Sequence, residues 1–255
     1  MTIAIIPARM ASTRFPGKPM APIHGIPMIG HCFYRSKMSN CLDAVYIATC
    51  DEEIREYALS IGAMCIMTAS THERASDRIA EAMLTIENES GVQHETIVLV
   101  QGDEPMLHPE MIDLTVKALE EDPNLLVVNG MAEIATLKEF EDPNEIKVVF
   151  DRNLDAIYFS REPIPSKTKW DGKLSMWKQV CIIPFRRNYL LEFNDTLQTP
   201  LEKIESIDML RVIESGGTVR MVKMPNHTVS VDTQEDLDMV SQLMKSDSLI
   251  GRYDI

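Results

Sequence analysis

The sequence predicts an α/β protein with a mixed, mostly parallel sheet flanked by helices and a β-rich lobe inserted in the second half. Three observations lead to this fold class. Short apolar runs alternate with longer helical patterns over about the first 120 residues, strand-like runs follow closely from about residue 125 to 200, and the alternation then returns. Alternating strands and helices are typical of parallel sheets covered on both faces. We expect one domain over residues 1–255.

The elements of the first half are expected where the apolar pattern changes its period. Uninterrupted apolar runs indicate buried strands, and apolar residues three or four positions apart indicate helices. The strands are expected at Thr2–Pro7, Ala44–Thr49, Ala63–Met67 and Thr96–Gln101. The helices are expected at Ile29–Met38, Glu52–Ile61, Ser76–Glu87 and Glu110–Glu120.

The second half begins with strand-like segments separated by short intervals. The segments LLVVNGM, KVVF, AIYFS and VCIIPF indicate antiparallel strands that extend the core sheet or form a small lobe, with one short helix near Thr136–Phe140. A helix at Lys203–Glu214, a strand at Thr218–Lys223 and a helix capped by Asp232 or Thr233 follow. From about residue 245 we expect a frayed tail.

Composition excludes several classes of protein. The net charge of −14 argues against nucleic acid as a partner, because binding to a phosphate backbone needs an excess of Lys and Arg. Five cysteines without CxxC spacing indicate neither a zinc site nor a disulfide framework, which fits a reducing cytoplasm. No apolar run approaches the ~18 residues that span a bilayer, so no membrane association is expected.

One loop concentrates positive charge in this acidic chain. The segment Ile6–Pro19, IPARMASTRFPGKP, carries Arg9, Arg14 and Lys18 among small residues. Three neighbouring cations repel one another unless an anion neutralises them or solvent screens them. Open backbone N–H groups and nearby hydroxyls suit phosphate oxygens. The loop is therefore a phosphate site or a solvated basic turn, and it matches neither GxxxxGK[ST] nor GxGxxG.

Two carboxylates follow predicted strands, where ligands bind in open α/β sheets. Asp103 comes after the run TIVLVQ in QGDEP, and Asp232 ends a strand in SVDTQED. Asp103 could instead form a turn before Pro105, and Asp232 could cap the following helix. Two strand-end carboxylates together with a basic loop favour phosphoryl or nucleotidyl transfer, in which metals and cations surround the same phosphates.

Ordered segments over nearly the whole chain resemble the 3-deoxy-manno-octulosonate (Kdo) cytidylyltransferases, the CMP-Kdo synthetase family. They are RMASTRFPGKP, QGDEP, PNEIKVVFD, AIYFSREPIP, LEKIESIDMLR and VDTQEDLD. The resemblance implies a Rossmann-like nucleotidyltransferase fold and a homodimer formed through the β-rich lobe. It also implies transfer of CMP from CTP to an eight-carbon sugar acid, with release of pyrophosphate, for bacterial lipopolysaccharide.

The resemblance also assigns residues to roles. It implies that Lys18, Asp103 and Asp232 are catalytic and that both aspartates hold Mg²⁺. Nucleotide contacts are implied for Ala8, Arg9, Ser12, Arg14, Lys18, His72, Ser76 and Arg78. Sugar contacts are implied for Gln101, Arg161, Gln179, Ile183 and Asp208. Without the motif around it, Arg161 would be interpreted as an exposed cation at the end of a strand.

Departures from the family pattern fall on the sugar positions. Gln179, Ile183 and Asp208 stand where the family has His, Tyr and Glu. A shorter acid and the loss of an imidazole would favour an ammonium group on the sugar, so 8-amino-3,8-dideoxy-manno-octulosonate (Kdo8N) is the favoured substrate and Kdo the alternative. In the cytosine turn, Arg74 and Ala75 replace the family's Ser and Gly.

Two further classes remain open from the sequence. A sialate cytidylyltransferase would share the basic loop and a strand-end acid, but it is not expected to combine QGDEP with VDTQED. A homologue that only binds nucleotide would need a broken phosphate loop or metal pair, and Arg9, Lys18, Asp103 and Asp232 are all present.

Overall fold

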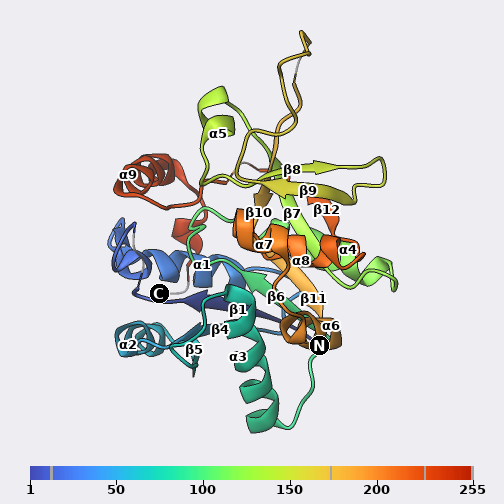
Figure 1. Cartoon of the computed structure of the whole chain (residues 1–255). Helices are drawn as coiled ribbons and strands as arrows, with labels where there is room; N and C mark the ends of the chain where they lie inside the picture. Colours follow the sequence, from blue (N-terminus) through green and yellow to red (C-terminus); the bar gives the residue numbers. More distant parts are fainter. Residues whose placement is uncertain (12–13, 173, 227, 254–255) are drawn as a thin grey trace. The chain divides into compact units, whose positions relative to one another are not determined.

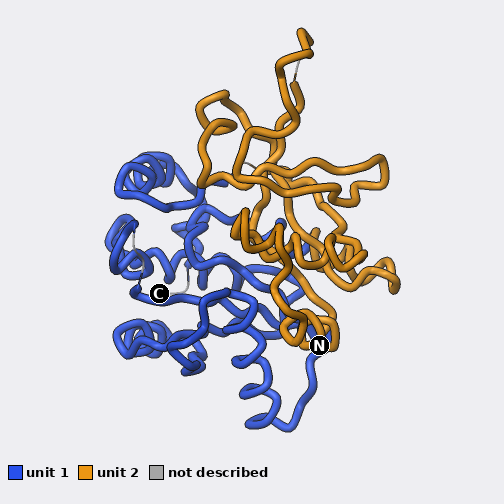
Figure 2. Tube along the Cα trace, viewed as in Figure 1, with its two compact units in different colours: residues 1–113, 228–255 blue, residues 114–227 orange. Residues whose placement is uncertain are grey.

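The chain forms two compact units in the computed structural model, which describes residues 1–11, 14–172, 174–226 and 228–253 (Figure 2). Unit 1 comprises Met1–Asp113 and Thr228–Ile255, and unit 2 comprises Leu114–His227. The chain passes from the first unit to the second within helix α4, Pro109–Glu121. The second unit is therefore longer than the lobe expected between about residues 125 and 200.

Four parallel strands form the centre of unit 1, in the order β6-β1-β4-β5 (Figure 1). Ile3 of β1 lies opposite Ala44 on one side and Ile97 on the other. The central position of β1 explains its continuous apolar run, because a strand covered on both faces has no solvated side. The strands span Thr2–Ala8 (β1), Ala44–Thr49 (β4), Met64–Met67 (β5) and Thr96–Val100 (β6).

Helices connect these strands at nearly the predicted positions. Helices α1 and α2 pack against each other so closely that a Cβ at Gly30 would lie 2.2 Å from the Tyr57 hydroxyl. Helix α3 returns the chain from the edge strand β5 to β6 and packs against β1, β4, β5 and β6. The remaining elements of unit 1 are α1 (Met28–Lys37), α2 (Glu52–Ser60), α3 (Ala75–Ser90), α9 (Gln234–Leu243), β2 (Pro22–Ile23), β3 (Ile26–Pro27), η1 (Lys18–Met20), η2 (Met244–Ser246) and η3 (Ile250–Arg252).

The expectation of a frayed tail from residue 245 is wrong as far as Tyr253. Tyr253 is buried and stacks on Tyr34, with ring centroids 4.9 Å apart. Its hydroxyl accepts a hydrogen bond of 2.8 Å from Nε of Arg35, and Asp247 accepts one of 2.6 Å from Nη2 of the same side chain. The segment is therefore fixed by residues more than 200 positions away, which no local pattern reveals.

Unit 2 is built on a sheet of order β12-β7-β10-β8-β9. Strands β7 and β12 run parallel, and the other neighbours are antiparallel, as expected for the lobe. The strands of this sheet are β7 (Val128–Glu133), β8 (Lys147–Phe150), β9 (Ala156–Ser160), β10 (Trp177–Val180) and β12 (Arg220–Lys223), and unit 2 also contains β11 (Ile182–Arg186), which is not part of it. Its helices are α5 (Leu137–Glu141), α6 (Arg187–Asp195), α7 (Pro200–Glu205) and α8 (Met209–Glu214).

The single helix predicted at Lys203–Glu214 is wrong, because the chain forms two short helices there. Ser206 follows α7 with a φ of 56°, and α8 begins at Met209. The break lets the buried Arg211 bind Glu202 with two hydrogen bonds of 2.8 and 2.6 Å. Nine residues of straight helix would separate these two positions by about 13 Å along the axis, too far for this pair.

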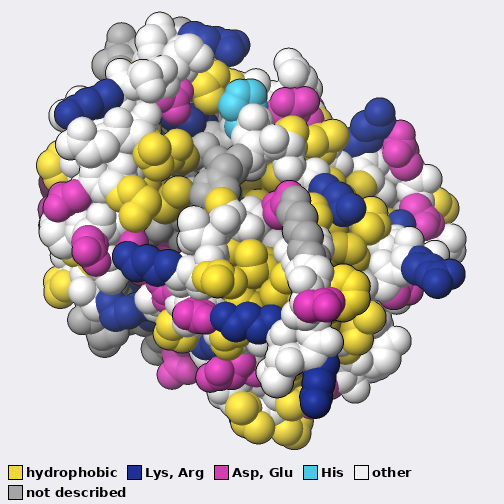
Figure 3. Space-filling model, turned by 90° about the horizontal axis from the view of Figure 1, so that it is seen from above, with side chains coloured by type: hydrophobic (Ala, Val, Ile, Leu, Met, Phe, Trp, Pro, Cys, Tyr) yellow, Lys and Arg dark blue, Asp and Glu magenta, His cyan; other side chains and the backbone are white. Residues whose placement is uncertain are grey.

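A bilayer-spanning protein needs a long apolar helix, and a nucleic-acid-binding protein needs a basic surface. Within the described ranges, no helix combines the length and the apolar character needed to cross a bilayer. On the face in Figure 3, Lys and Arg side chains are scattered among Asp and Glu rather than gathered in one basic field.

Candidate active site

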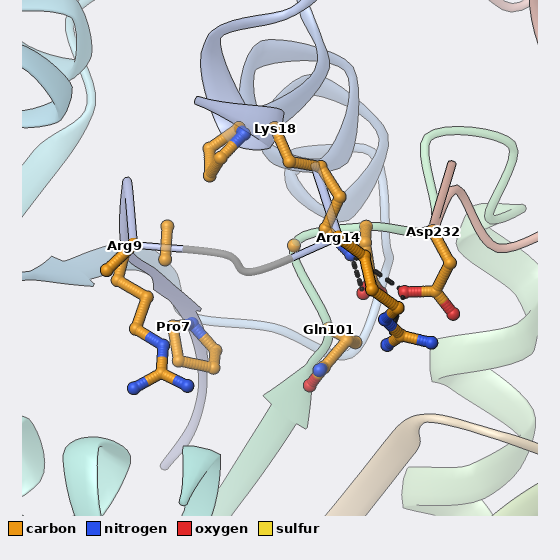
Figure 4. Close-up of a pocket in the computed structure, with 11 residues that line it drawn as sticks. Pro7, Arg9, Arg14, Lys18, Gln101 and Asp232 are labelled. Atoms are coloured by element: carbon orange, nitrogen blue, oxygen red, sulfur yellow. Dashed lines mark hydrogen bonds and ion pairs between the residues drawn. The ribbon is translucent and has the colours of Figure 1, made fainter. Parts of the chain in front are cut away.

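A cavity of about 310 Å³ opens where β1 and β6 of unit 1 end (Figure 4). It brings together residues from the basic loop, from the turn after β6 and from the segment before α9. The lining residues are Pro7, Ala8, Arg9, Ala11, Arg14, Lys18, Pro19, Gln101, Gly102, Asp103 and Asp232. Seven of the sequence-predicted site residues are among them, namely Ala8, Arg9, Arg14, Lys18, Gln101, Asp103 and Asp232. Ser12 lies outside the described residues.

The Lys18 ammonium joins both predicted metal ligands. Its Nζ donates to Oδ2 of Asp103 at 2.7 Å, to Oδ1 of Asp232 at 3.2 Å and to the carbonyl of Val231 at 2.9 Å. Nη2 of Arg14 donates to the same oxygen of Asp232 at 3.0 Å, as Figure 4 shows. Burial lowers the pKa of Lys18, but the two carboxylates outweigh it, so the pKa lies above its ordinary value.

Local hydrogen bonds fix both acids. The amide of Val231 donates to the carbonyl of Asp103 at 2.9 Å, which ties the segment before α9 to the turn after β6. The expectation that Asp232 ends a strand is wrong, because the described residues between β12 and α9 form no strand. Thr233 is the N-cap of α9, because its side chain accepts from the amide of Asp236. The alternative that Asp232 caps this helix is therefore wrong, and its carboxylate faces Lys18 and the cavity instead.

The basic loop is anchored by a residue that the sequence reasoning did not select. Oδ2 of Asp51, which follows β4, accepts a hydrogen bond of 2.8 Å from the amide of Met10. Gly17 closes the loop with a φ of 73° and a hydrogen bond of 3.1 Å to the carbonyl of Met10. Asp51 occupies a strand end just as Asp103 does, so the same rule of strand-end carboxylates could have found it.

The donor set of the cavity fits a divalent cation that a substrate helps to hold. Asp103 and Asp232 offer hard oxygen ligands within reach of one common cation. Nowhere in the described ranges do three or more His, Cys, Asp or Glu side chains form a group that could hold an ion alone. Mg²⁺ is commonly bound by one or two carboxylates together with substrate phosphates, so two aspartates suffice for it.

A second, smaller cavity of about 150 Å³ shares Pro7, Ala8, Arg9 and Gln101 with the first. Arg9 donates from Nη1 to the carbonyl of His72 at 3.4 Å, and the His72 imidazole pairs with Glu81. The cavity is lined by Pro7, Ala8, Arg9, His72, Glu73, Arg74, Ala75, Arg78 and Gln101.

Arg78 is the buried cation of this smaller cavity. It is 3% exposed, and its Nη1 donates to Oγ1 of Thr68 and to the carbonyl of Ala69. Its Nη2 has no hydrogen-bond partner in the described part of the chain. Ser76, also predicted to bind nucleotide, is fully buried in the first turn of α3 and is not among the lining residues.

Four of the residues predicted to contact the sugar belong to unit 2. The guanidinium of Arg161 donates to the carbonyls of Glu205 at 2.7 Å and Pro143 at 2.9 Å, so it is bound by backbone rather than left as a solvated cation. Nε2 of Gln179 donates to Oδ1 of Asn129 at 2.6 Å. Ile183 is buried, and Asp208 precedes α8 without capping it. Their contact with a sugar stays a prediction.

Known proteins resemble this chain over almost its entire length. A family model described as cytidylyltransferase matches residues 3–224. The 3-deoxy-manno-octulosonate cytidylyltransferase of Pelobacter propionicus is 41% identical over 244 residues, which cover 92% of this chain and 93% of the relative. The protein of that name from Geobacter metallireducens is 40% identical over 247 residues, covering 93% and 95%.

Solved structures agree with these relatives. A CMP:2-keto-3-deoxy-manno-octonic acid synthetase complexed with CTP matches with a TM-score of 0.86 and 33% identity over 95% of this chain and 98% of the other. A cytidylyltransferase from Leptospira borgpetersenii, with a TM-score of 0.64 and 17% identity over 95% and 86%, shares the fold alone. The predicted family and α/β fold are confirmed. The chain belongs to the cytidylyltransferase family, among the 3-deoxy-manno-octulosonate cytidylyltransferases, and is a nucleotidyltransferase.

Proposed function

We propose that the enzyme transfers CMP from CTP to the anomeric hydroxyl of a 3-deoxy-octulosonate sugar acid and releases pyrophosphate. The anomeric oxygen forms a bond to the α-phosphorus, the bond from that phosphorus to the bridging oxygen of the β-phosphate breaks, and the hydroxyl proton leaves to solvent. The names of the relatives support this reaction. The observation that carries it is the cluster of Lys18, Asp103 and Asp232 at the sheet end, with Arg9 and Arg14 lining the same cavity.

The cations of the cavity suit a triphosphate. Arg9, Arg14 and Lys18 would neutralise phosphate oxygens in a partly enclosed site, where charge interactions are stronger than in water. Lys18 would offset the negative charge that develops on the departing pyrophosphate. When Mg²⁺ is bound by Asp103 and Asp232, it would polarise the phosphoryl oxygens and lower the pKa of the attacking hydroxyl.

The smaller cavity is the proposed site of the cytosine base. Arg78 supports this role, because a buried donor without a partner is costly unless a ligand supplies an acceptor. The carbonyl oxygen of cytosine is such an acceptor. The main chain of His72, held by Arg9, forms part of the cavity wall and links the base site to the triphosphate site.

The sugar could carry either a hydroxyl or an ammonium as its end group. The names of the relatives favour the terminal hydroxyl of Kdo. The changes to Gln179, Ile183 and Asp208 favour a terminal ammonium, because a carboxylate is kept while an ionisable imidazole and a phenol are lost. On these residues we propose Kdo8N as the preferred substrate and Kdo as the alternative.

One assay tests both the proposed reaction and the proposed end group of the sugar. Pyrophosphate release is measured with CTP and Mg²⁺ and with Kdo, Kdo8N or a sialic acid as acceptor. We expect release with the octulosonates and a higher kcat/KM for the amino sugar. No release with any acceptor would mean a nucleotide-binding protein, and release with sialic acid alone would overturn the substrate class.

A pair of back-substitutions tests the proposed choice of end group. The variant Gln179→His with Asp208→Glu should shift the ratio of kcat/KM values toward Kdo, since it restores the imidazole and the longer acid. An unchanged ratio would overturn the role of these positions. Leu197→Ala, an exposed change elsewhere in unit 2, is the control and should leave the ratio as in the wild type.

A further inference from the structure

The ammonium of Lys18 lies between the two carboxylates that the proposed function gives to a metal. We propose that Lys18 holds this place until a nucleotide arrives, so that the divalent cation and the triphosphate bind together and each strengthens the binding of the other. The inference rests on the proposed function, and it concerns the order and coupling of binding rather than the chemical step.

Distances make the ammonium and a metal competitors for the same oxygens. Nζ of Lys18 lies 2.7 Å from Oδ2 of Asp103 and 3.2 Å from Oδ1 of Asp232. Mg²⁺ binds oxygen at about 2.1 Å, so an ion on either of these oxygens would come within about 5 Å of the ammonium. The two like charges would repel each other strongly in this partly enclosed site. The metal therefore has to displace Lys18 from these oxygens.

All three donors of the Lys18 ammonium are engaged within the protein. Its three donors correspond to three acceptors, the two carboxylates and the carbonyl of Val231 at 2.9 Å. The side chain of Lys18 is 13% exposed, so solvent and salt screen its contacts only weakly. Displacing it without offering another acceptor would leave a nearly buried cation unpaired, which is unfavourable.

The charges of the cluster explain why a nucleotide would change this balance. Asp103 and Asp232 carry two negative charges, and Lys18 and Arg14 carry two positive charges in direct contact with them. A divalent cation alone therefore meets a neutral cluster. A triphosphate gives Lys18 and Arg14 new anionic acceptors, and the two carboxylates are then left for the metal.

Such an exchange is an energetic coupling between two ligands. If the nucleotide tightens metal binding by some factor, the metal must tighten nucleotide binding by the same factor. Arg14 takes a smaller part than Lys18, because its side chain is 52% exposed and pairs with Asp232, whereas the ammonium of Lys18 contacts both carboxylates. Lys18 is thus the residue that decides the coupling.

Arg9 supplies a matched control within the same cavity. It carries the same charge as Lys18 and lines the same wall, but its Nη1 donates to the carbonyl of His72. A general change in the electrostatic potential would act through either residue. Competition for the carboxylate oxygens would act through Lys18 alone.

The experiment titrates the protein with Mn²⁺ without nucleotide or sugar and follows free Mn²⁺ by its electron paramagnetic resonance signal. We expect weak binding by the wild type and at least about tenfold tighter binding by Lys18→Met, a factor within the usual range of such couplings. Arg9→Gln should change the affinity by no more than about twofold. Tighter Mn²⁺ binding would be unexpected if Lys18 only held Asp103 and Asp232 in position, because the variant loses its contacts with both carboxylates.

The reciprocal measurement follows CTP binding by calorimetry with and without Mn²⁺. Wild-type protein should bind CTP at least about tenfold more tightly with Mn²⁺, and Lys18→Met should lose most of this factor. If Lys18→Met folds poorly in a thermal melt, Lys18→Gln replaces it, since the amide cannot neutralise two carboxylates. Mn²⁺ affinity that is unchanged or weaker in the folded variant, or raised equally by Arg9→Gln, overturns the proposal.

Failure of this inference can be told apart from failure of the proposed function, because Mn²⁺ binding needs neither sugar nor turnover. Pyrophosphate release by the wild type together with unchanged Mn²⁺ affinity in Lys18→Met would overturn the exchange and leave the function standing. Tighter Mn²⁺ binding in Lys18→Met, with no pyrophosphate release by the wild type, would support the exchange and overturn the function.

Discussion

Two clusters of the same kind, one in each unit, differ in what surrounds them. In each, one lysine ammonium binds two carboxylates, at 2.7 and 3.2 Å around Lys18 and at 2.8 and 3.0 Å around Lys178. The side chain of Lys18 is 13% exposed and lines a cavity, whereas that of Lys178 is 3% exposed. The acids are Asp103 and Asp232 in the first cluster and Glu139 and Glu145 in the second. Equal contact geometry therefore does not mean an equal role.

The surroundings of Lys178 indicate that it stabilises the fold and does not bind a ligand. It lies on β10, between β7 and β8, and binds one acid from α5 and one from the segment before β8. Burial lowers the pKa of Lys178, but the two glutamates outweigh it and raise the pKa above its ordinary value. An ammonium enclosed in this way cannot exchange its partners for those of a ligand, whereas the Lys18 cluster opens onto a cavity that a ligand can fill.

The largest expected effect concerns the stability of the enclosed cluster. Lys178→Met should lower the free energy of unfolding by about 3–5 kcal/mol, because it leaves two neighbouring carboxylates without their cation. Lys18→Met should cost less, about 1–3 kcal/mol, since Asp103 and Asp232 line a cavity from which water can reach them. Urea unfolding at neutral pH measures both. Equal losses in the two variants would break the comparison.

Removal of the acids provides the control for this prediction. Adding Glu139→Gln and Glu145→Gln to Lys178→Met should recover part of the lost stability, because the uncompensated charges disappear with them. No recovery would mean that the loss comes from packing of the lysine stem rather than from charge.

Activity should show the opposite order. Lys18→Met should lower kcat/KM for pyrophosphate release about 100-fold or more, which corresponds to about 2.7 kcal/mol of transition-state stabilisation. Lys178→Met, assayed well below its unfolding temperature, should stay within about threefold of the wild type. Steady-state assays at several CTP concentrations check this. A larger loss in Lys178→Met than in Lys18→Met would reverse the proposed roles.

The parts of unit 1 that depend on local patterns could be predicted from the sequence. The continuous apolar run of β1 marks a central strand, the concentration of cations marks the loop of Lys18, and the position of Asp103 and Asp232 after apolar runs marks the carboxylates of the cavity. The fold class followed from the alternation of these runs with helices, which needs no knowledge of distant contacts.

Features that depend on distant contacts were missed. The pair of Glu202 with Arg211 breaks a helix that its periodicity predicts as continuous. Tyr253 orders a polar terminal segment through Arg35, and Asp51 anchors Met10 from a different strand. Such contacts join residues that no helix or strand period relates, whether nine positions apart, as in the Glu202 pair, or more than 200, and a single sequence holds no record of which of them meet.

Arg35 extends the comparison, because it lies in unit 1 but is as deeply buried as Lys178. Arg35 is fully buried near His31, whose Nε2 hydrogen-bonds the carbonyl of Ile23 at 2.9 Å. Burial lowers the pKa of His31 from 6.5 to about 4. The hydrogen bond to the Ile23 carbonyl opposes this shift, and the positive charge of Arg35 adds to it. The unfolded chain therefore binds a proton more readily than the folded chain between about pH 6.5 and 4.

The free energy of unfolding should therefore decrease as the pH is lowered. The contribution of His31 is present above about pH 6.5 and is lost as the pH falls toward 4. Between pH 7 and pH 5 the loss amounts to about 2 kcal/mol. Urea unfolding of the wild type and of His31→Gln at several pH values measures it as the difference between the two pH slopes. Equal slopes would show that His31 is neither buried nor neutral in the folded protein.

The smallest expected effect tests whether Tyr253, like Lys178, stabilises the fold without affecting activity. Tyr253→Phe removes a hydroxyl that binds Nε of Arg35 at 2.8 Å and Nδ1 of His31 at 3.0 Å, and it keeps the ring stacked on Tyr34. The free energy of unfolding should fall by about 1 kcal/mol, while pyrophosphate release stays unchanged. The exposed change Arg252→Gln should leave both values as in the wild type. If Tyr253→Phe is also silent, Arg35 is held by Asp247 and the backbone alone, and burial of a cation in unit 1 does not require the terminal tyrosine.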